Sequence, residues 1–183
     1  LSTNAENTKW VYSIDIDNDG DLDIFSTSET DMNSIVWYEN DGNANFYHHI
    51  IDSIEEGYKM VSATDLDGDG DLDLFATSDN DDNALVWFEN NGNESFSKHL
   101  ISSSFDRAEI AAAADLDGDG DIDIAATVIN GPRQLYWFKN DGDENFSDHL
   151  IRHGSVDYAL DVADIDGDGD IDLITAESAG NFG

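Results

Sequence analysis

Residues 65–73 read DLDGDGDLD, and this stretch decides the fold because the chain repeats it. Its copies are DIDNDGDLD at 15–23, DLDGDGDID at 115–123 and DIDGDGDID at 164–172. The copies begin 50, 50 and 49 residues apart. Self-similarity at a fixed period of roughly 20–50 residues is typical of repeat architectures. We therefore expect an array of equivalent units.

A second recurring element follows three of the four copies. It reads VWYENDGNANFYHHII at 36–51, VWFENNGNESFSKHLI at 86–101 and YWFKNDGDENFSDHLI at 136–151. The fourth unit stops at Gly183, before this element would begin. The chain thus holds about 3.7 units. They form one partial domain over 1–183, with repeats at about 9–58, 59–108 and 109–158 and a truncated one at 159–183.

Each unit is expected to contain four short strands. In the first unit they are 10–14, 22–25, 35–38 and 46–50, which are rich in β-branched and aromatic residues. The Asn-Asp-Gly run at 40–42 predicts a turn between the last two strands, because Asn and Gly tolerate a positive φ. Ile35 and Trp37 lie on one face of the third strand, and Val36 and Tyr38 on the other. A sheet that is apolar on both faces must be covered twice, as a propeller blade is by its neighbours.

The acidic stretches have the ligands of a hard cation. Aspartates recur at positions 1, 3, 5, 7 and 9, and a glycine at position 6 permits a sharp reversal. Positions 1, 3, 5 and 9 offer carboxylates, and position 7 is expected to offer its backbone carbonyl while its side chain lies in solvent. The predicted ligands are Asp15, Asp17, Asp19, Asp21, Asp23, Asp65, Asp67, Asp69, Asp71, Asp73, Asp115, Asp117, Asp119, Asp121, Asp123, Asp164, Asp166, Asp168, Asp170 and Asp172.

Calcium suits these loops better than other metals. A flexible ring of oxygen ligands favours Ca²⁺, whereas Mg²⁺ demands tighter octahedral geometry. No His or Cys lies in any loop, which disfavours zinc. An EF-hand needs Glu at position 12, where this chain has Ser26, Ala76, Ala126 and Thr175. We expect four Ca²⁺ ions, one in each loop, rather than a set of solvated turns.

The overall charge excludes some partners. The chain carries 42 Asp and Glu against 7 Lys and Arg, a formal net charge of −35. Such a polyanion is not expected to bind nucleic acid or anionic lipid. No run approaches the roughly 20 apolar residues of a membrane span, so membrane insertion is not expected either. There is no cysteine, which rules out disulfides and thiolate metal sites.

The acidic loops and the WYENDG-type hairpins (37–42) resemble the FG-GAP/VCBS repeat family, the calcium-loop blades of integrin α-subunit propellers and of many secreted proteins. The resemblance implies a β-propeller, most often seven-bladed, with calcium between the first two strands of each blade. Where integrin repeats have Gly-Ala-Pro, this chain has Ser26-Thr27-Ser28, so it is closer to the VCBS branch. Fold alone does not set function.

Three functions stay open at this stage. The first is a non-catalytic, secreted or cell-surface module with a structural, adhesion or carbohydrate-binding role. The second is the propeller of a polysaccharide lyase or dehydratase, although the sequence shows no catalytic motif. The third is a subunit of an extracellular filament or surface layer. The open ends of the array would be covered by the rest of the chain or by further copies.

Residues that break the repeat are candidates for a specific ligand contact. Arg107, Arg133 and Arg152 are all expected at the rim opposite the acidic loops, in or near the third repeat. The planar guanidinium suits carboxylates and sulfates, so an acidic glycan or a protein could bind there. The alternative is that these arginines pair with local acids. Glu39 and Glu89 align with Lys139, and we interpret this position as a solvated edge.

Overall fold

The structure is a computed structural model that describes residues 8–28, 34–54, 57–79, 84–93, 95–129, 132–154 and 159–176. All regular structure in these ranges is β-strand, as predicted. The first sheet contains β1 (Thr8–Ile14), β2 (Asp23–Ser28), β3 (Ser34–Asn40) and β4 (Phe46–Ser53). The second contains β5 (Tyr58–Thr64), β6 (Asp73–Ser78), β7 (Leu85–Asn90) and β8 (Phe96–Ser102). The third contains β9 (Arg107–Ala114), β10 (Asp123–Ile129), β11 (Arg133–Asn140) and β12 (Phe146–His153), and β13 (Ala159–Ala163) pairs with β14 (Asp172–Ala176).

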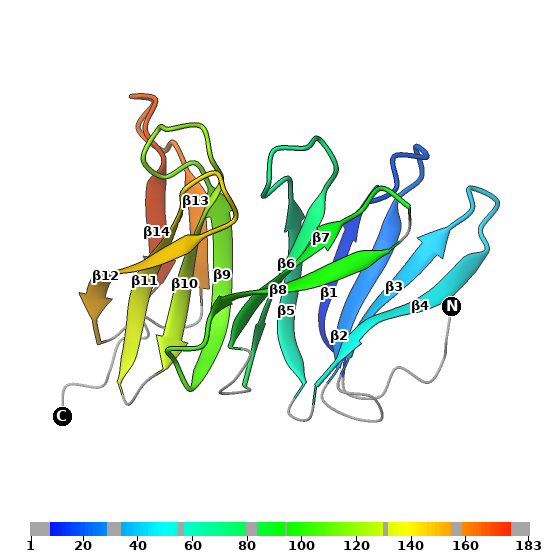
Figure 1. Ribbon diagram of the computed structural model, residues 1–183, viewed down its shortest axis with the longest axis horizontal. Coiled ribbons are helices and arrows are strands. Elements are labelled where there is room, and N and C mark those ends of the chain that lie inside the picture. The colour runs from blue at the N-terminus through cyan, green and yellow to red at the C-terminus, as the bar shows by residue number, and fades with distance from the viewer. Residues whose placement is uncertain are drawn as a thin grey trace.

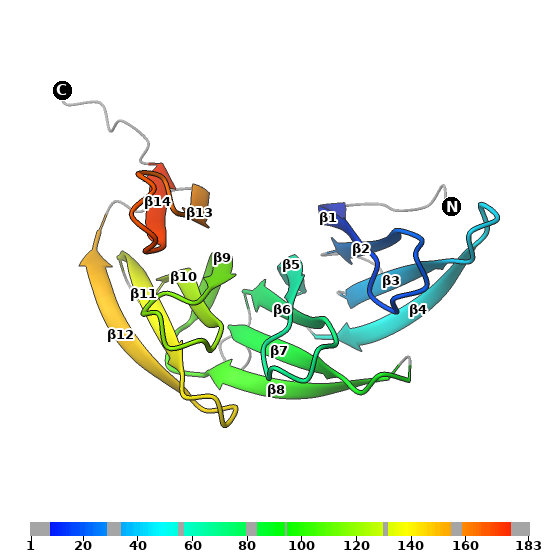
Figure 2. The ribbon, with the colours of Figure 1, turned by 90° about the horizontal axis from the view of Figure 1, so that it is seen from above.

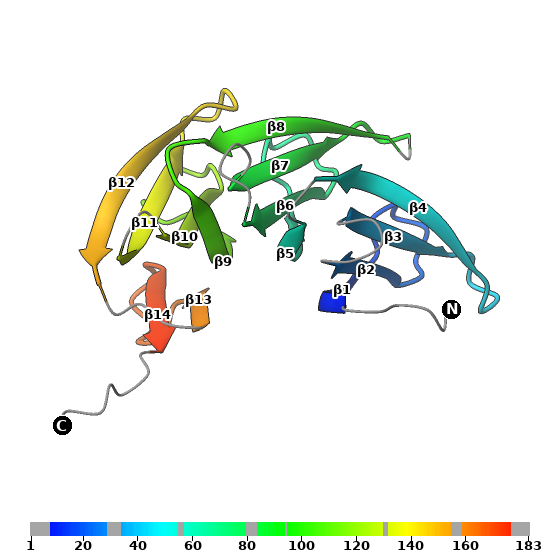
Figure 3. The ribbon, with the colours of Figure 1, turned by 90° about the horizontal axis from the view of Figure 1, so that it is seen from below.

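Each sheet is a propeller blade of antiparallel strands in sequential order. Three blades have four strands, and the fourth has two among the described residues. Viewed from above and from below, the blades stand side by side in an open arc (Figures 2 and 3). The first strands β1, β5, β9 and β13 line the concave side, and β4, β8 and β12 form the convex edge (Figure 2).

The core lies between blades, which explains why both faces of the third strands are apolar. Trp37 and Trp87 are each 1% exposed. Phe96 of the second blade meets Trp37 of the first edge-on, with ring centroids 6.2 Å apart. Contacts of this kind stabilise aromatic pairs beyond the area that they bury. Phe146, the equivalent residue of the third blade, packs against the buried cluster that contains Trp87, so the first two gaps between blades each hold an aromatic contact.

Most strands of the first blade are longer than the sequence predicts: β1 begins at Thr8, β3 covers Ser34–Asn40 and β4 ends at Ser53. The second strands begin one residue later and run on to Ser28, Ser78 and Ile129. Thr27 and Thr77 in these extensions are fully buried. Their hydroxyls donate to the carbonyls of Lys59 (3.0 Å) and Glu109 (3.1 Å) in the next blade. The polar run after each apolar strand therefore belongs to the interface between blades.

The turns between the third and fourth strands lie where the sequence predicts them, but they are five residues long. In the first blade β3 ends at Asn40 and β4 begins at Phe46. Asp41 N donates to Asn45 O at 3.2 Å and closes the turn. The Asp41 carboxylate accepts hydrogen bonds from Asn45 and from the backbone of Asn43, which lowers its pKa.

Figure 1 shows that the connections between first and second strands all lie on one rim of the arc, together with the five-residue turns. The loops at 15–23, 65–73, 115–123 and 164–172 are called loops 1 to 4 below. The fold therefore gathers most of the negative charge of the chain on this rim. The second strands end and the third strands begin on the opposite rim.

Candidate metal centres

Each of loops 1 to 4 is held in a curl by its own aspartates. In loop 2, the two oxygens of Asp65 accept hydrogen bonds from Gly68 N (2.8 Å) and Gly70 N (3.1 Å). Asp67 Oδ1 accepts from Asp69 N at 3.0 Å, and Asp69 Oδ1 accepts from Asp71 N at 2.8 Å. Gly70 has φ +98°, a conformation that L side chains rarely adopt. The curl thus follows from glycine and alternating aspartate.

The curl brings carboxylates together at one point in all four loops. One carboxylate oxygen from each of three aspartates lies within 4.8 Å of the others in every cluster. The clusters are Asp15, Asp17 and Asp19; Asp65, Asp67 and Asp73; Asp115, Asp117 and Asp123; and Asp164, Asp166 and Asp172. Two carboxylates about 4 Å apart repel by roughly 4 kcal/mol at an effective dielectric constant near 20. A cation among them would remove this repulsion.

Position 9 supplies a buried carboxylate. Asp73 is fully buried and accepts hydrogen bonds from Asn90 N (2.8 Å) and Leu66 N (2.8 Å). Burial raises the pKa of Asp73 to about 6, against the opposing effect of these two hydrogen bonds. Burial likewise raises the pKa values of Asp23 and Asp123. In loops 1 to 3, position 9 is therefore a carboxylate whose charged form the protein alone does not fully stabilise.

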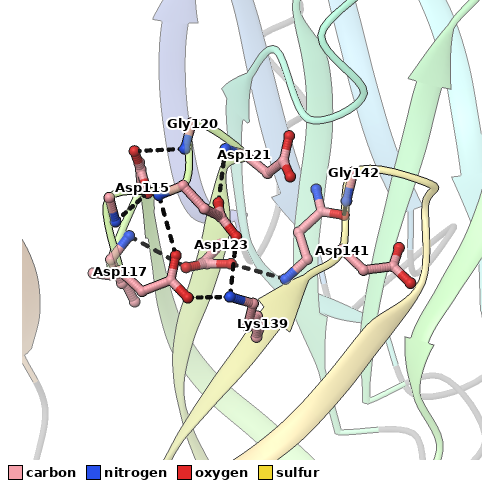
Figure 4. A network of polar contacts seen from close by, with 12 residues as sticks. Asp115, Asp117, Gly120, Asp121, Asp123, Lys139, Asp141 and Gly142 are labelled. Atoms are coloured by element: carbon pink, nitrogen blue, oxygen red, sulfur yellow. Dashed lines mark hydrogen bonds and ion pairs between the residues drawn. The ribbon is translucent and has the colours of Figure 1, made fainter.

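The predicted ligands differ in how many of the four clusters contain them. Positions 1 and 3 belong to every cluster, position 9 to three clusters and position 5 to one, that of Asp19. Position 7 belongs to none of the four. Its side chain was expected in solvent, but in the third blade Asp121 points toward the turn at Gly142 (Figure 4). A Cβ built on Gly142 would lie 2.7 Å from Asp121 Oδ2.

The donor set fits a hard divalent cation. All the clustered atoms are carboxylate oxygens, which is the ligand type that Ca²⁺ and Mg²⁺ prefer. Asp15 Oδ1 is buried and has no hydrogen-bond partner among the described residues. Such an oxygen is costly to bury unless a cation compensates it. The four clusters can therefore hold a metal ion.

One residue of the third strand behaves differently in the third blade. In the first two blades it is a glutamate: Glu39 meets His49 Nε2 at 2.7 Å, and Glu89 meets His99 Nε2 at 3.0 Å. Both histidines lie against a tryptophan, with ring centroids 4.8 Å and 4.6 Å apart. The glutamates are thus half-buried partners of histidine rather than solvated edge residues. This finding corrects the sequence interpretation of the position.

In the third blade the same position is Lys139, and it contacts the acidic loop. Lys139 Nζ donates to Asp117 Oδ2 and lies 3.0 Å from Asp119 Oδ2 (Figure 4). The ammonium group lowers the pKa of Asp119, and both carboxylates raise the pKa of Lys139. The sequence alone shows that the charge at this position changes sign. The contact between Lys139 and loop 3 could not be predicted from it, because that contact depends on the antiparallel register of the strands.

The three arginines lie on the rim opposite the acidic loops. Arg107 and Arg133 sit at one end of β9 and β11, where both pair with Ile129 of β10. Arg107 Nη1 lies 3.8 Å from Asp79 Oδ1, and Arg133 Nη2 lies 3.8 Å from Glu109 Oε1.

Lys59 and Arg152 also lie on this rim. Lys59 joins the same group, with Nζ 2.7 Å from Asp79 Oδ1 and 2.8 Å from Glu109 Oε1. Arg152 lies on β12, opposite Leu135. Asp79 and Glu109 therefore each bridge cationic side chains from neighbouring blades.

Sequence reasoning missed the asparagine that closes each third strand. Asn140 N donates to Asp123 Oδ1 at 2.8 Å, and Asn140 Nδ2 donates to Leu66 O at 2.9 Å in loop 2. Asn90 makes the same bond to Ile16 O at 3.3 Å. In the second and third blades, one side chain thus ties the acidic loop of its own blade to the acidic loop of the preceding blade. Its recurrence at 40, 90 and 140 is the available signal, but the Asn-x-Gly pattern by itself indicates only a turn.

The comparisons with known proteins agree with this architecture. The model of the FG-GAP-like repeat matches residues 15–76, 65–126 and 115–175. No curated protein matches the chain. Within the described residues, no helix is long and apolar enough to cross a membrane. Overlapping matches that each span two successive acidic loops cover most of the sequence, and the chain therefore belongs to the FG-GAP-like repeat family.

Proposed function

We propose that this chain is a calcium-binding repeat module in which one Ca²⁺ per loop stabilises each blade. The observation that carries the proposal is the fourfold recurrence of three carboxylate oxygens within 4.8 Å of one another. Positions 1, 3, 5 and 9 would supply carboxylates, and position 7 its backbone carbonyl. Bound calcium would supply positive charge that links the two strands flanking the loop. Flexible rings of oxygen ligands favour Ca²⁺ over Mg²⁺.

The role that we propose is non-catalytic and extracellular. The recurring aspartates are explained by the curled loops that they form. This supports a structural scaffold rather than a catalytic site. Millimolar calcium outside cells would fill sites that cytosolic calcium would leave empty, which supports a secreted or cell-surface location. The FG-GAP-like repeat is typically a structural module, and this supports adhesion or carbohydrate binding over catalysis.

Isothermal titration calorimetry and thermal melting test the calcium proposal directly. Chelator-treated protein should bind Ca²⁺ with release of protons and gain thermal stability, and Mg²⁺ should do so far less effectively. The double variant Asp65→Asn with Asp67→Asn should lose one site. The matched control is Asp71→Asn in the same loop, which removes a carboxylate that lies outside the cluster. Absence of calcium binding by the unaltered protein would refute the proposal.

The ligand contact proposed at Arg107, Arg133 and Arg152 requires a separate measurement. Two of these arginines already face Asp79 and Glu109, so an acidic glycan would have to compete with these carboxylates. Retention on an acidic polysaccharide column should fall when all three are replaced by alanine. Equal retention of the variant and the unaltered protein would restrict these arginines to ion pairs within the array.

A further inference from the structure

Lys139 contacts two predicted ligands of loop 3, of which Asp117 belongs to the carboxylate cluster and Asp119 does not. Asp117 Oδ1 accepts from Asp119 N at 3.3 Å, and Asp119 Oδ1 accepts from Asp121 N at 3.0 Å. These backbone bonds engage one oxygen of each carboxylate. Lys139 Nζ engages the other oxygen of both, Asp117 Oδ2 and Asp119 Oδ2 (Figure 4).

The lysine is held in place by its surroundings. Its Nζ lies 5.9 Å from the centroid of the Trp137 ring, and its side chain is 32% exposed. A cation over the face of a tryptophan is stabilised by the ring. His149, which has no glutamate partner in this blade, instead meets Ser147 Oγ at 3.1 Å. The neighbouring side chains of the third blade thus accommodate a cation where the first two blades have a glutamate.

In the second blade the residue equivalent to Lys139 is Glu89, which carries the opposite charge. Glu89 Oε2 lies 3.0 Å from His99 Nε2. Four loop carboxylates and Glu89 give this site five negative charges. Loop 3 has the same four aspartates, but Lys139 reduces the net charge there to three. A divalent ion responds to this difference with twice the energy of a monovalent one.

We propose that Lys139 is a built-in competitor for calcium, so that loop 3 binds Ca²⁺ more weakly than loop 2 and keeps its fold without it. To bind, the ion must displace the ammonium group from Asp117 and Asp119. We expect a dissociation constant at loop 3 about tenfold or more above that of loop 2, which corresponds to about 1.4 kcal/mol. This inference rests on the proposed calcium function and deepens it.

The test follows each loop separately by NMR. The amides of Gly70 and Gly120 bond to Asp65 and Asp115 and report on loops 2 and 3. During a calcium titration of the full chain, the Gly70 resonance should shift at a lower concentration than that of Gly120. The variant Lys139→Glu should bring the Gly120 transition to the Gly70 concentration. Lys139→Met, which removes the charge and keeps the length, should move it part of the way.

The reciprocal variant and the chelated state complete the design. Glu89→Lys should shift the Gly70 transition to higher calcium by about tenfold or more, and leave the Gly120 transition unchanged. In chelator, Lys139→Met should speed hydrogen exchange at Gly120 and leave Gly70 unaffected. Coincident transitions in the unaltered protein, with no response to any of these variants, would overturn the role of Lys139. No transition at either glycine would instead overturn the calcium function itself.

Discussion

At the scale of single residues, the position 9 aspartates join loops 1 to 3 to the sheet. Asp73 is fully buried, yet its two oxygens bond to the backbone at Asn90 and Leu66. The sequence predicted a carboxylate ligand at this position from spacing alone. It did not predict the burial, because burial depends on the third strand and on the neighbouring blade. Burial raises the pKa of Asp73, and its hydrogen bonds to the backbone act in the opposite direction.

The response to pH should change sign with calcium. The pKa of Asp73 rises from 3.8 to about 6 in the folded protein, so the folded state binds this proton more tightly than the unfolded chain. In chelator, the melting temperature should therefore rise as the pH falls from 7 toward 5. In saturating calcium it should fall over the same interval, because protons compete with the ion for carboxylates.

Melting curves in both buffers measure this reversal. The groups with lowered pKa, such as Asp52 and Asp41, affect stability only below their ordinary value of 3.8 and do not interfere between pH 5 and 7. Asp73→Asn should reduce the rise in chelator, because it removes the carboxyl group whose pKa burial raises to about 6. A metal-free protein that loses stability between pH 7 and 5 would contradict the explanation.

A glycine in the second turn should be less replaceable than one in the acidic loop. Gly92 has φ +67°, and a Cβ there would lie 2.8 Å from Asp71 Oδ2. Gly68 has φ +78° with open space around it. Gly68→Ala should cost about 1 kcal/mol for the backbone alone, and Gly92→Ala about 2 kcal/mol or more. Urea unfolding of both variants in saturating calcium measures the difference, and equal costs would show that Asp71 moves away freely.

At the scale of elements, the sequence located every strand of the first blade but not the bonds between blades. Alternating apolar residues, Gly and Asn specify a strand and its turn locally. Thr27 and Asn90 look like polar strand ends in this reading. Their partners, Lys59 O and Ile16 O, are 32 and 74 residues away, so no local pattern could identify them. The period of the repeat was the only sequence signal for these contacts.

The same asparagine should matter more inside the array than in the first blade. Asn140 Nδ2 bonds both to Ile122 O at 3.2 Å in its own blade and to Leu66 O at 2.9 Å in the preceding one. Asn40 Nδ2 bonds to Leu22 O at 3.1 Å in its own blade. Asn140→Ala should cost about 1–3 kcal/mol, because it leaves buried carbonyls without a donor, and Asn40→Ala about 1 kcal/mol or less.

Denaturant melts of Asn140→Ala and Asn40→Ala at fixed calcium provide the comparison. The two variants carry the same chemical change at equivalent positions, so the difference between them isolates the bond between blades. Equal losses of stability would mean that the bond to Leu66 contributes nothing measurable. A larger loss for Asn40→Ala would contradict the assignment of the interface.

At the scale of the whole molecule, the blades stand side by side because each blade leaves apolar residues that the next blade covers. The residue at position 2 of the loop is buried by the next blade in loops 1 and 2, where Ile16 and Leu66 are 1% and 4% exposed. Ile165 in loop 4 is 64% exposed, and no described blade follows it. The apolar faces of the third strands allowed the side-by-side packing to be predicted. The curvature could not be, because it arises from the angle between blades, which no residue pattern encodes.

The arc also concentrates charge, and this should make the metal-free protein sensitive to salt. Twenty of the 42 acidic residues lie in loops 1 to 4, and all four loops lie on one rim (Figure 1). Raising NaCl from 0.1 M to 1 M shortens the Debye length from about 10 Å to about 3 Å and screens repulsion between loops. In chelator, the melting temperature should therefore rise over this range.

Calcium-saturated protein is the matched control for this salt effect. Bound ions would neutralise part of the charge on the rim, so the same change in NaCl should raise the melting temperature less. Loop 3, where Lys139 already offsets part of the charge, should respond least when hydrogen exchange at Gly120 is compared with that at Gly70. A larger salt response in the presence of calcium than in its absence would mean that repulsion among the loops is not what limits the stability of the array.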